Sequence, residues 1–246
     1  MANRIKGNVL ITGANRGVGL ELTKSLLENP LVRKVYAGCR NGDQTSSLTS
    51  LEDPYKKLTV LELDITKDWA IRSAIENITN DSGNLNVLIN NAAILEQDGK
   101  SGIGKGDRVA WLKHFDVNVV SHAMVIQESL PLLKKSLEMH ELSTIVNISG
   151  LKGSIGNGTN TDLVHGNYAY GCSKAALNKL TKTLSIEYPL IMTVSICPGW
   201  NKTSMGGPQA LSDPQTTAPI ILETVNGMSI ENSGGFWDRK GRPIPF

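Results

Sequence analysis

Tyr170 and Lys174 are the two residues whose types and spacing most directly suggest chemistry. They stand four positions apart in the stretch NYAYGCSKAAL. Residues four apart share one face of a helix, so a phenol and an ammonium at this spacing would reach one site. A free phenol has a pKa of about 10, and a nearby ammonium favours the phenolate and lowers that pKa. We therefore expect Tyr170 to exchange a proton with a substrate.

A second tyrosine two residues earlier does not fit this scheme. The residue four positions after Tyr168 is Cys172, which offers no cation. A tyrosine and a lysine at this spacing are common in proteins, so the chemistry depends on what the rest of the chain places around them.

The stretch from Gly7 to Arg40 predicts a strand, a glycine-rich turn, a helix and a second strand. Its turn carries Gly13, Gly17 and Gly19 in the spacing GxxxGxG. Glycines allow the backbone to turn tightly and to approach a ligand closely. The N-terminus of the following helix offers free N–H groups and a positive dipole end, which suit a pyrophosphate. The alternative is a plain glycine-rich turn in another α/β protein.

These two motifs resemble those of the short-chain dehydrogenase/reductase family. TGANRGVG is similar to the family's TGxxxGxG, and YxxxK, about 150 residues later, is similar to its catalytic pair. The ending GGFWDRKGRPIPF narrows the resemblance to Sniffer-type and C-factor-type carbonyl reductases. The resemblance covers the whole chain and implies one Rossmann-type, doubly wound α/β domain over residues 1–246. Its sheet would have about seven mainly parallel strands, with helices on both faces.

The end of the second predicted strand indicates which cofactor the turn would take. A fold that binds NAD usually has an acidic residue there, on the ribose 2′-hydroxyl. This strand ends Gly38-Cys39-Arg40, so a guanidinium stands where a 2′-phosphate would lie. Arg16 in the turn offers a second cation. Both features favour NADP, and the alternative for each arginine is an ordinary surface position.

Three further elements match cofactor-binding segments of the family. Asp64-Ile65 stands at its acidic position beside the adenine; a helix cap for residues 67–80 is the alternative, but Thr66 serves that role better and leaves Asp64 free. Asn90-Asn91-Ala92-Ala93 resembles NNAG, and Pro198-Gly199 resembles the motif that precedes the nicotinamide-binding threonine. By this resemblance the cofactor contacts are Gly13, Asn15, Arg16, Gly17, Val18, Gly19, Arg40, Asp64, Ile65, Asn91, Ala92, Ala93, Tyr170, Lys174, Pro198, Gly199 and Thr203.

Asn118 is a further candidate for the catalytic machinery. It lies in FDVNV, which resembles the family's NVN element, within a helix that we expect over Arg108–Leu137. In the family this asparagine sits at a helix distortion and holds a water for a proton relay. The alternative is an asparagine on the helix surface.

The sequence departs from the family at the residue that would hydrogen-bond the substrate carbonyl. The family has serine at the end of the fifth strand, and this chain has Gly150 there, preceded by Ser149. Neighbouring residues of a strand point to opposite faces, so Ser149 serves only if the strand end is bulged or bent. Ser154 could approach from the following loop, and a site without any serine is the third possibility.

Composition limits the other function classes. The 246 residues include 40% hydrophobic residues, and the net charge is +2. Neither a dense basic run nor an apolar span of membrane length is present, so we expect no nucleic-acid or membrane partner. Three widely spaced cysteines indicate neither a disulfide framework nor a metal site. We expect a cytoplasmic protein, since the N-terminus lacks the apolar segment of a signal peptide.

The leading function hypothesis is a carbonyl reductase that transfers hydride from NADPH to a small-molecule carbonyl substrate. The alternative is an NADP(H)-binding protein with weak or no catalysis, which Gly150 suggests. The loops 96–107 and 156–166, together with Trp200 and Met205, are candidates for the substrate site. The resemblance also implies a possible homodimer through Arg108–Leu137 and Asn167–Glu187.

Overall fold

The computed structural model describes residues 3–40, 45–96, 103–104, 106–157 and 167–246. Within these residues seven strands form one sheet, and every neighbouring pair is parallel. The strands are β1 (Gly7–Thr12), β2 (Val32–Cys39), β3 (Leu58–Glu62), β4 (Val87–Asn90), β5 (Thr144–Ile148), β6 (Met192–Cys197) and β7 (Phe236–Asp238). The predicted fold class is confirmed.

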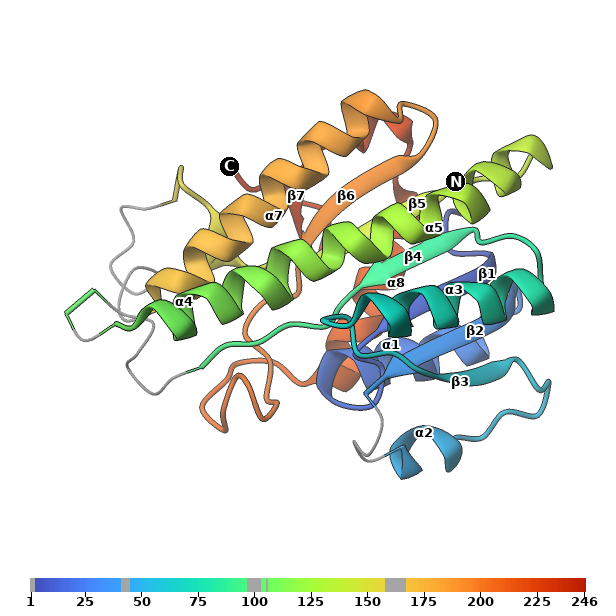
Figure 1. Ribbon diagram of the computed structural model, residues 1–246, viewed down its shortest axis with the longest axis horizontal. Coiled ribbons are helices and arrows are strands. Elements are labelled where there is room, and N and C mark those ends of the chain that lie inside the picture. Colours follow the sequence, from blue (N-terminus) through green and yellow to red (C-terminus); the bar gives the residue numbers. More distant parts are fainter. Residues whose placement is uncertain (1–2, 41–44, 97–102, 105, 158–166) are drawn as a thin grey trace.

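Helices connect the strands and cover both faces of the sheet (Figure 1). Those in the described part of the chain are α1 (Gly17–Glu28), α2 (Ser46–Thr49), α3 (Asp68–Asp81), α4 (Arg108–Phe115), the π-helix η1 (Asp116–Val120), α5 (Ser121–Glu138), the 3-10 helix η2 (Leu151–Gly153), α7 (Tyr168–Glu187), α8 (Pro214–Gly227) and the 3-10 helix η3 (Ile230–Asn232).

The strands are apolar on both sides because both sides are covered. In β1, Val9 and Ile11 pack in the core beneath α1 and α8, whereas Leu10 packs in the core beneath α3, α5 and α7. All three side chains are fully buried. Alternate residues of a strand face opposite sides, so a strand between two helical layers needs an uninterrupted apolar run.

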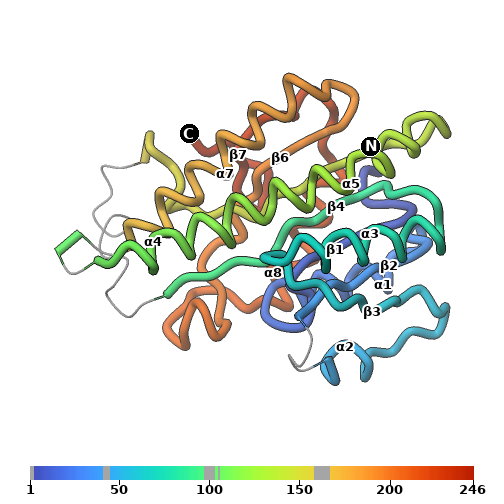
Figure 2. The backbone as a smooth tube through the Cα atoms, viewed as in Figure 1, coloured from blue at the N-terminus to red at the C-terminus, as the bar shows by residue number. Residues whose placement is uncertain are grey.

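The order of strands across the sheet is β3-β2-β1-β4-β5-β6-β7. The chain runs outward from β1 through β2 to β3 and then returns to place β4 on the other side of β1, as the colours in Figure 2 show. The C-terminal ends of β1 and β4 therefore flank the point where the strand order reverses. In open α/β sheets this is where ligands bind. Gly13 follows β1 directly, and Asn91 follows β4.

The helix expected over Arg108–Leu137 carries a distortion around Asn118, as the family resemblance implies. The structure divides it into α4, the π-helix η1 and α5. A π-helix fits an extra residue into one turn and often marks a functional position.

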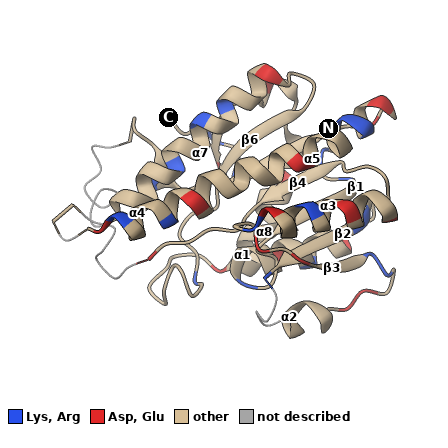
Figure 3. Ribbon diagram, in the orientation of Figure 1, with Lys and Arg blue, Asp and Glu red and all other residues tan. Residues whose placement is uncertain are grey.

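No helix in the described part of the chain has both the length and the apolar content needed to cross a membrane. Figure 3 shows charged residues of both signs interspersed along the outer helices, in keeping with the net charge of +2.

Candidate active site

A cleft of about 610 Å³ opens at the C-terminal ends of the strands. Of the predicted cofactor contacts, all but Gly199 line it. Those that do so are Gly13, Asn15, Arg16, Gly17, Val18, Gly19, Arg40, Asp64, Ile65, Asn91, Ala92, Ala93, Tyr170, Lys174, Pro198 and Thr203. The elements predicted from separate parts of the sequence therefore meet around one space.

The glycine turn forms one side of this cleft, and its glycines cannot carry side chains. A Cβ on Gly13 would lie 2.9 Å from Ala92 Cα, and one on Gly19 would lie 2.2 Å from the carbonyl oxygen of Gly13. Gly13 and Gly17 also have positive φ angles of 64° and 54°, which favour glycine. A Cβ on Gly17 would meet the methyl group of Thr203 at 3.0 Å, so the turn also touches the loop after β6.

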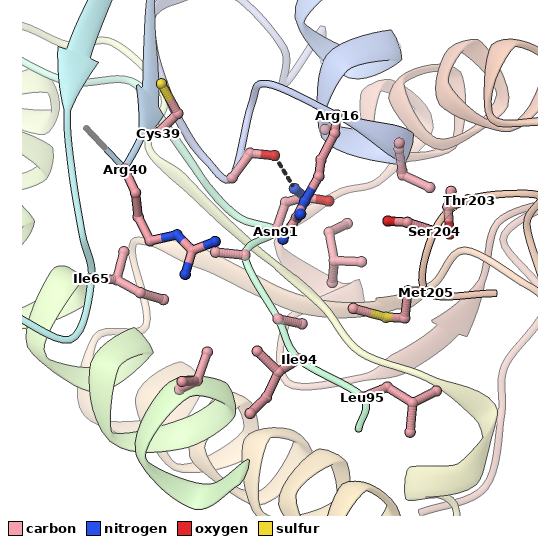
Figure 4. A pocket seen from close by; sticks show the side chains of 18 of the residues that line it. Arg16, Cys39, Arg40, Ile65, Asn91, Ile94, Leu95, Thr203, Ser204 and Met205 are labelled. Atoms are coloured by element: carbon pink, nitrogen blue, oxygen red, sulfur yellow. Dashed lines mark hydrogen bonds between the residues drawn. The ribbon is translucent and has the colours of Figure 1, made fainter. Parts of the chain in front are cut away.

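Two arginines enter the cleft from the glycine turn and from the end of β2. Arg16 immediately precedes α1, and Arg40 immediately follows β2. Both residues are exposed at the surface. Figure 4 shows their side chains extending toward the middle of the cleft. Two guanidinium groups, at the part of the cleft between the glycine turn and the end of β2, provide a cationic subsite for an anionic group.

Asp64 lines the cleft beside Arg40, and the expectation that it is free of a local partner is wrong, whereas its contact with the cofactor stays a prediction. Its Oδ1 accepts hydrogen bonds from Thr66 N at 3.0 Å and from Thr66 Oγ1 at 2.8 Å. Thr66 was expected to cap the next helix, yet α3 begins at Asp68 and has no side-chain cap. The carboxylate and the threonine thus form a local turn that keeps one oxygen of Asp64 occupied.

Tyr170 and Lys174 lie one turn apart on α7 and both line the cleft. Lys174 Nζ lies 5.8 Å from the centroid of the Tyr170 ring and donates a 2.8 Å hydrogen bond to the carbonyl oxygen of Ile148 at the end of β5. The i, i+4 spacing therefore brings phenol and amine to one site, as predicted. Tyr168, two residues earlier, is 39% exposed and does not line the cleft.

Burial controls the protonation of both groups. It lowers the pKa of Lys174 to about 7, because the ammonium is removed from water. It also raises the pKa of Tyr170 above its usual value. The sequence led us to expect that the ammonium would lower the pKa of Tyr170, and in this respect the expectation is wrong. Loss of solvation outweighs the attraction of a lysine whose own charged form is disfavoured.

No serine stands beside the Tyr170 hydroxyl at the position where the family has one. A Cβ on Gly150 would lie 2.9 Å from Tyr170 Oη. Ser149 lines the cleft, but its hydroxyl donates to Oδ1 of the buried Asn178 at 2.7 Å. A hydroxyl has a single proton to donate. This hydrogen bond therefore disfavours the catalytic role of Ser149, which stays a prediction.

Ser154 is directed away from the cleft. Its hydroxyl donates to the carbonyl oxygen of Pro245 and accepts from Asn157 N at 3.2 Å. It therefore holds the C-terminal segment against the loop that follows β5. Residues 158–166 of the candidate loop 156–166 lie outside the described residues, as do 97–102 and 105 of the loop 96–107.

Asn118 is fully buried at the centre of η1 and does not line the cleft itself. Its Oδ1 accepts from Ile94 N at 2.9 Å. Its Nδ2 donates to the carbonyl oxygen of Ile94 at 3.1 Å and to Ser173 Oγ at 3.0 Å. The helix distortion implied by the family resemblance is therefore present, and Asn118 joins the segment after β4 to α7. The surface position considered as the alternative is excluded.

The loop after β6 supplies the remaining wall. Thr203 and Met205 line the cleft, but Trp200 is 51% exposed and lies outside its lining. The indole of Trp200 donates to the carbonyl oxygen of Gly206 at 2.7 Å. Gly199 has a positive φ of 77° and packs beside Arg239. Gly199 thus shapes the loop, and its contact with the cofactor stays a prediction.

Sequence reasoning missed several residues of the cleft wall. They end a strand, follow a strand end or lie on the helix opposite, and they are Cys39, Leu63, Thr66, Ile94, Leu95, Lys113, Asp116, Val117, Ile148 and Ser204. The available signal was position: a residue just beyond a strand that ends in a binding motif continues along the same edge of the sheet. The residues on α4 and η1 had no such signal.

Known proteins with similar sequences and structures belong to the same family that the motifs resemble. A sequence model of the short chain dehydrogenase family matches residues 7–213. The chain therefore belongs to this family of oxidoreductases. It is 33% identical over 222 residues to benzil reductase ((S)-benzoin forming) IRC24 of Saccharomyces cerevisiae, covering 87% of this chain and 80% of that protein.

Among solved structures, the carbonyl reductase Sniffer of D. melanogaster superimposes with a TM-score of 0.89 and 36% identity, over 98% of this chain and 100% of that chain. An NADPH-bound carbonyl reductase from chicken fatty liver also gives 0.89, at 30% identity, over 97% and 98% of the two chains. The predicted family and the resemblance to Sniffer-type carbonyl reductases are confirmed.

Proposed function

We propose that this protein is an NADPH-dependent carbonyl reductase. One observation carries the proposal: Tyr170 and Lys174 line the same cleft as the glycine turn and the two arginines. A proton donor, the amine beside it and a dinucleotide cradle thus share one space of suitable size. The family supports hydride transfer as the reaction class, and the carbonyl reductases among its relatives support the substrate class.

The residues present fit NADPH. Gly13 and Gly19 leave no room for side chains, so their backbone can approach a pyrophosphate, and α1 begins at Gly17 with its free N–H groups directed at the cleft. Arg16 and Arg40 would hold the 2′-phosphate that distinguishes NADPH from NADH. At the other end, Thr203 and the backbone of Pro198 would hold the carboxamide of the nicotinamide. Bound NADPH supplies the hydride.

Tyr170 would give the proton to the carbonyl oxygen during reduction. That role requires a neutral phenol, and burial raises the pKa of Tyr170, so the phenol is protonated at neutral pH. The ammonium of Lys174 would then stabilise the phenolate left behind. Lys174 would also hold the nicotinamide ribose, while Nζ keeps its hydrogen bond to the carbonyl of Ile148. Asn118 would support the proton relay, as the resemblance implies.

The second candidate function is NADP(H) binding with weak or no catalysis. Gly150 and Ser149 favour it, because neither offers a hydroxyl proton to a substrate carbonyl. Loss of one such donor lowers a rate by about 10²–10³, if it behaves like one missing oxyanion-hole donor. This would weaken an enzyme without preventing cofactor binding. Tyr170 and Lys174 together favour the reductase, since a pure binding protein needs no proton donor.

The homodimer and the cytoplasmic location stay predictions. The helices expected at the dimer interface carry exposed apolar side chains: Val109 on α4 is 74% exposed and Ile186 on α7 is 70% exposed. Exposed apolar positions on both helices are consistent with an interface there.

The test is NADPH oxidation against a panel of aldehydes, quinones, steroids and diketones. Tyr170→Phe should abolish turnover while NADPH still binds, as measured by the enhanced emission of the bound cofactor. Tyr168→Phe is the matched control and should keep full activity, because this tyrosine lies outside the cleft. If the wild-type protein binds NADPH and reduces none of these carbonyls, the binding function replaces the reductase.

A further inference from the structure

The segment from Ala92 to Glu96 leaves the sheet and forms one wall of the cleft. All of its residues line the cleft. Strand pairing ends at Asn90, so the backbone N–H and C=O groups beyond this point need other partners. Thr12 Oγ1 accepts from Ala92 N at 3.1 Å and thus holds the beginning of the segment.

Three side chains of the helix opposite hold the rest of the segment. His122 Nε2 lies 2.7 Å from the carbonyl oxygen of Ala92, and Asn118 makes its two bonds to Ile94. His114 Nε2 accepts from Glu96 N at 3.2 Å. All three side chains are 0% exposed. Side chains, rather than a neighbouring strand, therefore fix the course of this wall.

The spacing of the three side chains matches the spacing of their partners. His114, Asn118 and His122 are four residues apart on the continuous run of α4, the π-helix η1 and α5. Their partners are alternate residues of the segment, namely Ala92, Ile94 and Glu96. One face of the helix thus hydrogen-bonds every second residue of the segment.

The two histidines need opposite tautomers to make these bonds. His114 Nδ1 lies 2.8 Å from the carbonyl oxygen of Ala110 and donates to it, which leaves Nε2 free of hydrogen to accept from Glu96 N. His122 donates from Nε2 to Ala92 O, so its Nδ1 carries no hydrogen, and this buried atom has no hydrogen-bond partner among the described residues. Burial, followed by the charge of Lys174, lowers the pKa of His122 to about 3. That histidine is therefore neutral.

We propose that His122 and His114 are positioning residues with separate tasks: His122 sets the cofactor part of the cleft, and His114 sets the substrate end. The proposal rests on the proposed function. Ala92, which His122 holds, packs against the cofactor-binding Gly13. Figure 4 shows Leu95, next to the residue that His114 holds, on the Met205 side of the view and away from Arg40 and Ile65.

The cofactor arm of the test compares His122→Leu with His122→Gln by titration of NADPH emission. Leucine cannot donate to Ala92 O, and we expect NADPH to bind at least about tenfold more weakly. Glutamine keeps an N–H at about the same reach and should recover most of that loss. Thermal melts of each variant check that the fold is intact. Equal binding by wild type and His122→Leu would overturn this half of the proposal.

The substrate arm compares His114→Leu with His114→Gln. For the leucine variant we expect a rise of about tenfold in KM for the carbonyl substrate with little change in kcat and in NADPH affinity. Glutamine, whose carbonyl oxygen can accept from Glu96 N, should restore the KM. Equal weakening of NADPH binding by His114→Leu and His122→Leu would contradict the separate tasks.

Two readouts do not require turnover. The imidazole ¹⁵N shifts of the wild-type protein should report an Nδ1–H tautomer for His114 and an Nε2–H tautomer for His122.

Amide exchange should accelerate at Glu96 in His114→Leu, while the Ile94 amide, held by Asn118, stays protected in the same sample. If wild type reduces no carbonyl, the proposed function fails, yet exchange and NADPH titration still decide the roles of the histidines. Unchanged exchange at Glu96 would overturn the role of His114.

Discussion

The hydroxyl of Tyr170 and the Cα of Gly150 are packed so closely that no side chain fits between them without movement. A Cβ on the glycine would lie 2.9 Å from the phenolic oxygen and 3.6 Å from two ring carbons. The residue that departs from the family pattern therefore lies beside the proposed proton donor, with no room between them for a Cβ. The phenol can occupy its present position only because residue 150 has no side chain.

Two substitutions at Gly150 separate packing from hydrogen bonding. Gly150→Ala displaces the phenol and adds no donor, so we expect kcat to fall about tenfold or more. Gly150→Ser causes the same displacement but adds a hydroxyl for the substrate carbonyl, worth about 10²–10³ in the case of one oxyanion-hole donor. The serine variant should therefore exceed the alanine variant at least about tenfold in kcat. Equal rates for the two would mean that another group already serves as the donor.

Ser149→Ala tests whether the neighbouring serine takes part in catalysis. Its hydroxyl donates to Asn178, so removal leaves a buried amide oxygen without that donor. We expect the free energy of unfolding to fall by about 1–3 kcal/mol, with kcat changed by less than about threefold. Urea denaturation and steady-state kinetics measure the two quantities. A large drop in kcat at unchanged stability would restore Ser149 as a catalytic residue.

The buried Lys174 predicts a pH dependence of stability. Its pKa is about 7 in the folded protein, against an ordinary value of 10.5. Between these values the unfolded chain binds more protons, so this group makes the protein more stable as the pH rises from about 7 toward 10. Each unit of pKa difference corresponds to about 1.36 kcal/mol. Unfolding free energies of the wild type should therefore gain a few kcal/mol relative to Lys174→Met over that range.

The stability curves of the wild type and Lys174→Met can be compared directly, because the two proteins share all other titratable groups. The hydrogen bond from Lys174 to Ile148 O is lost in the variant at every pH and does not alter the slope. Parallel stability curves would show that Lys174 does not have a depressed pKa. In the wild type, kcat/KM for reduction should decline as the pH rises through about 7, since the phenolate then loses its neighbouring ammonium.

The two arginines predict the choice between NADPH and NADH. Arg40→Ala should weaken NADPH binding about 10- to 100-fold, the range expected for a lost hydrogen bond to a charged group, and leave NADH binding unchanged. Arg16→Ala should act in the same direction. Arg72→Ala, an exposed arginine of α3 outside the cleft, is the matched control. Equal losses for both cofactors would mean that the arginines do not contact a 2′-phosphate.

The sequence by itself determined the fold class, the glycine turn and the Tyr170–Lys174 pair. These features depend on local pattern: apolar runs predict buried strands, glycine spacing predicts a close turn, and a four-residue interval places two side chains on one helix face. The family resemblance then assigned cofactor contacts to strand ends, and nearly all of them line the cleft, because the C-terminal ends of parallel strands meet at one edge of the sheet.

Only the tertiary structure decided what each polar group does with its hydrogen-bonding capacity. Ser149 and Ser154 were both open candidates in the sequence, but one hydroxyl is occupied by Asn178 and the other by Pro245. The direction of the Tyr170 pKa shift required its burial to be known. No local pattern in the sequence indicates the roles of His114 and His122, because the backbone groups that they hold in the cleft wall are about 20 to 30 residues away. Burial and long-range hydrogen bonds arise only when the chain is folded, and no local pattern contains them.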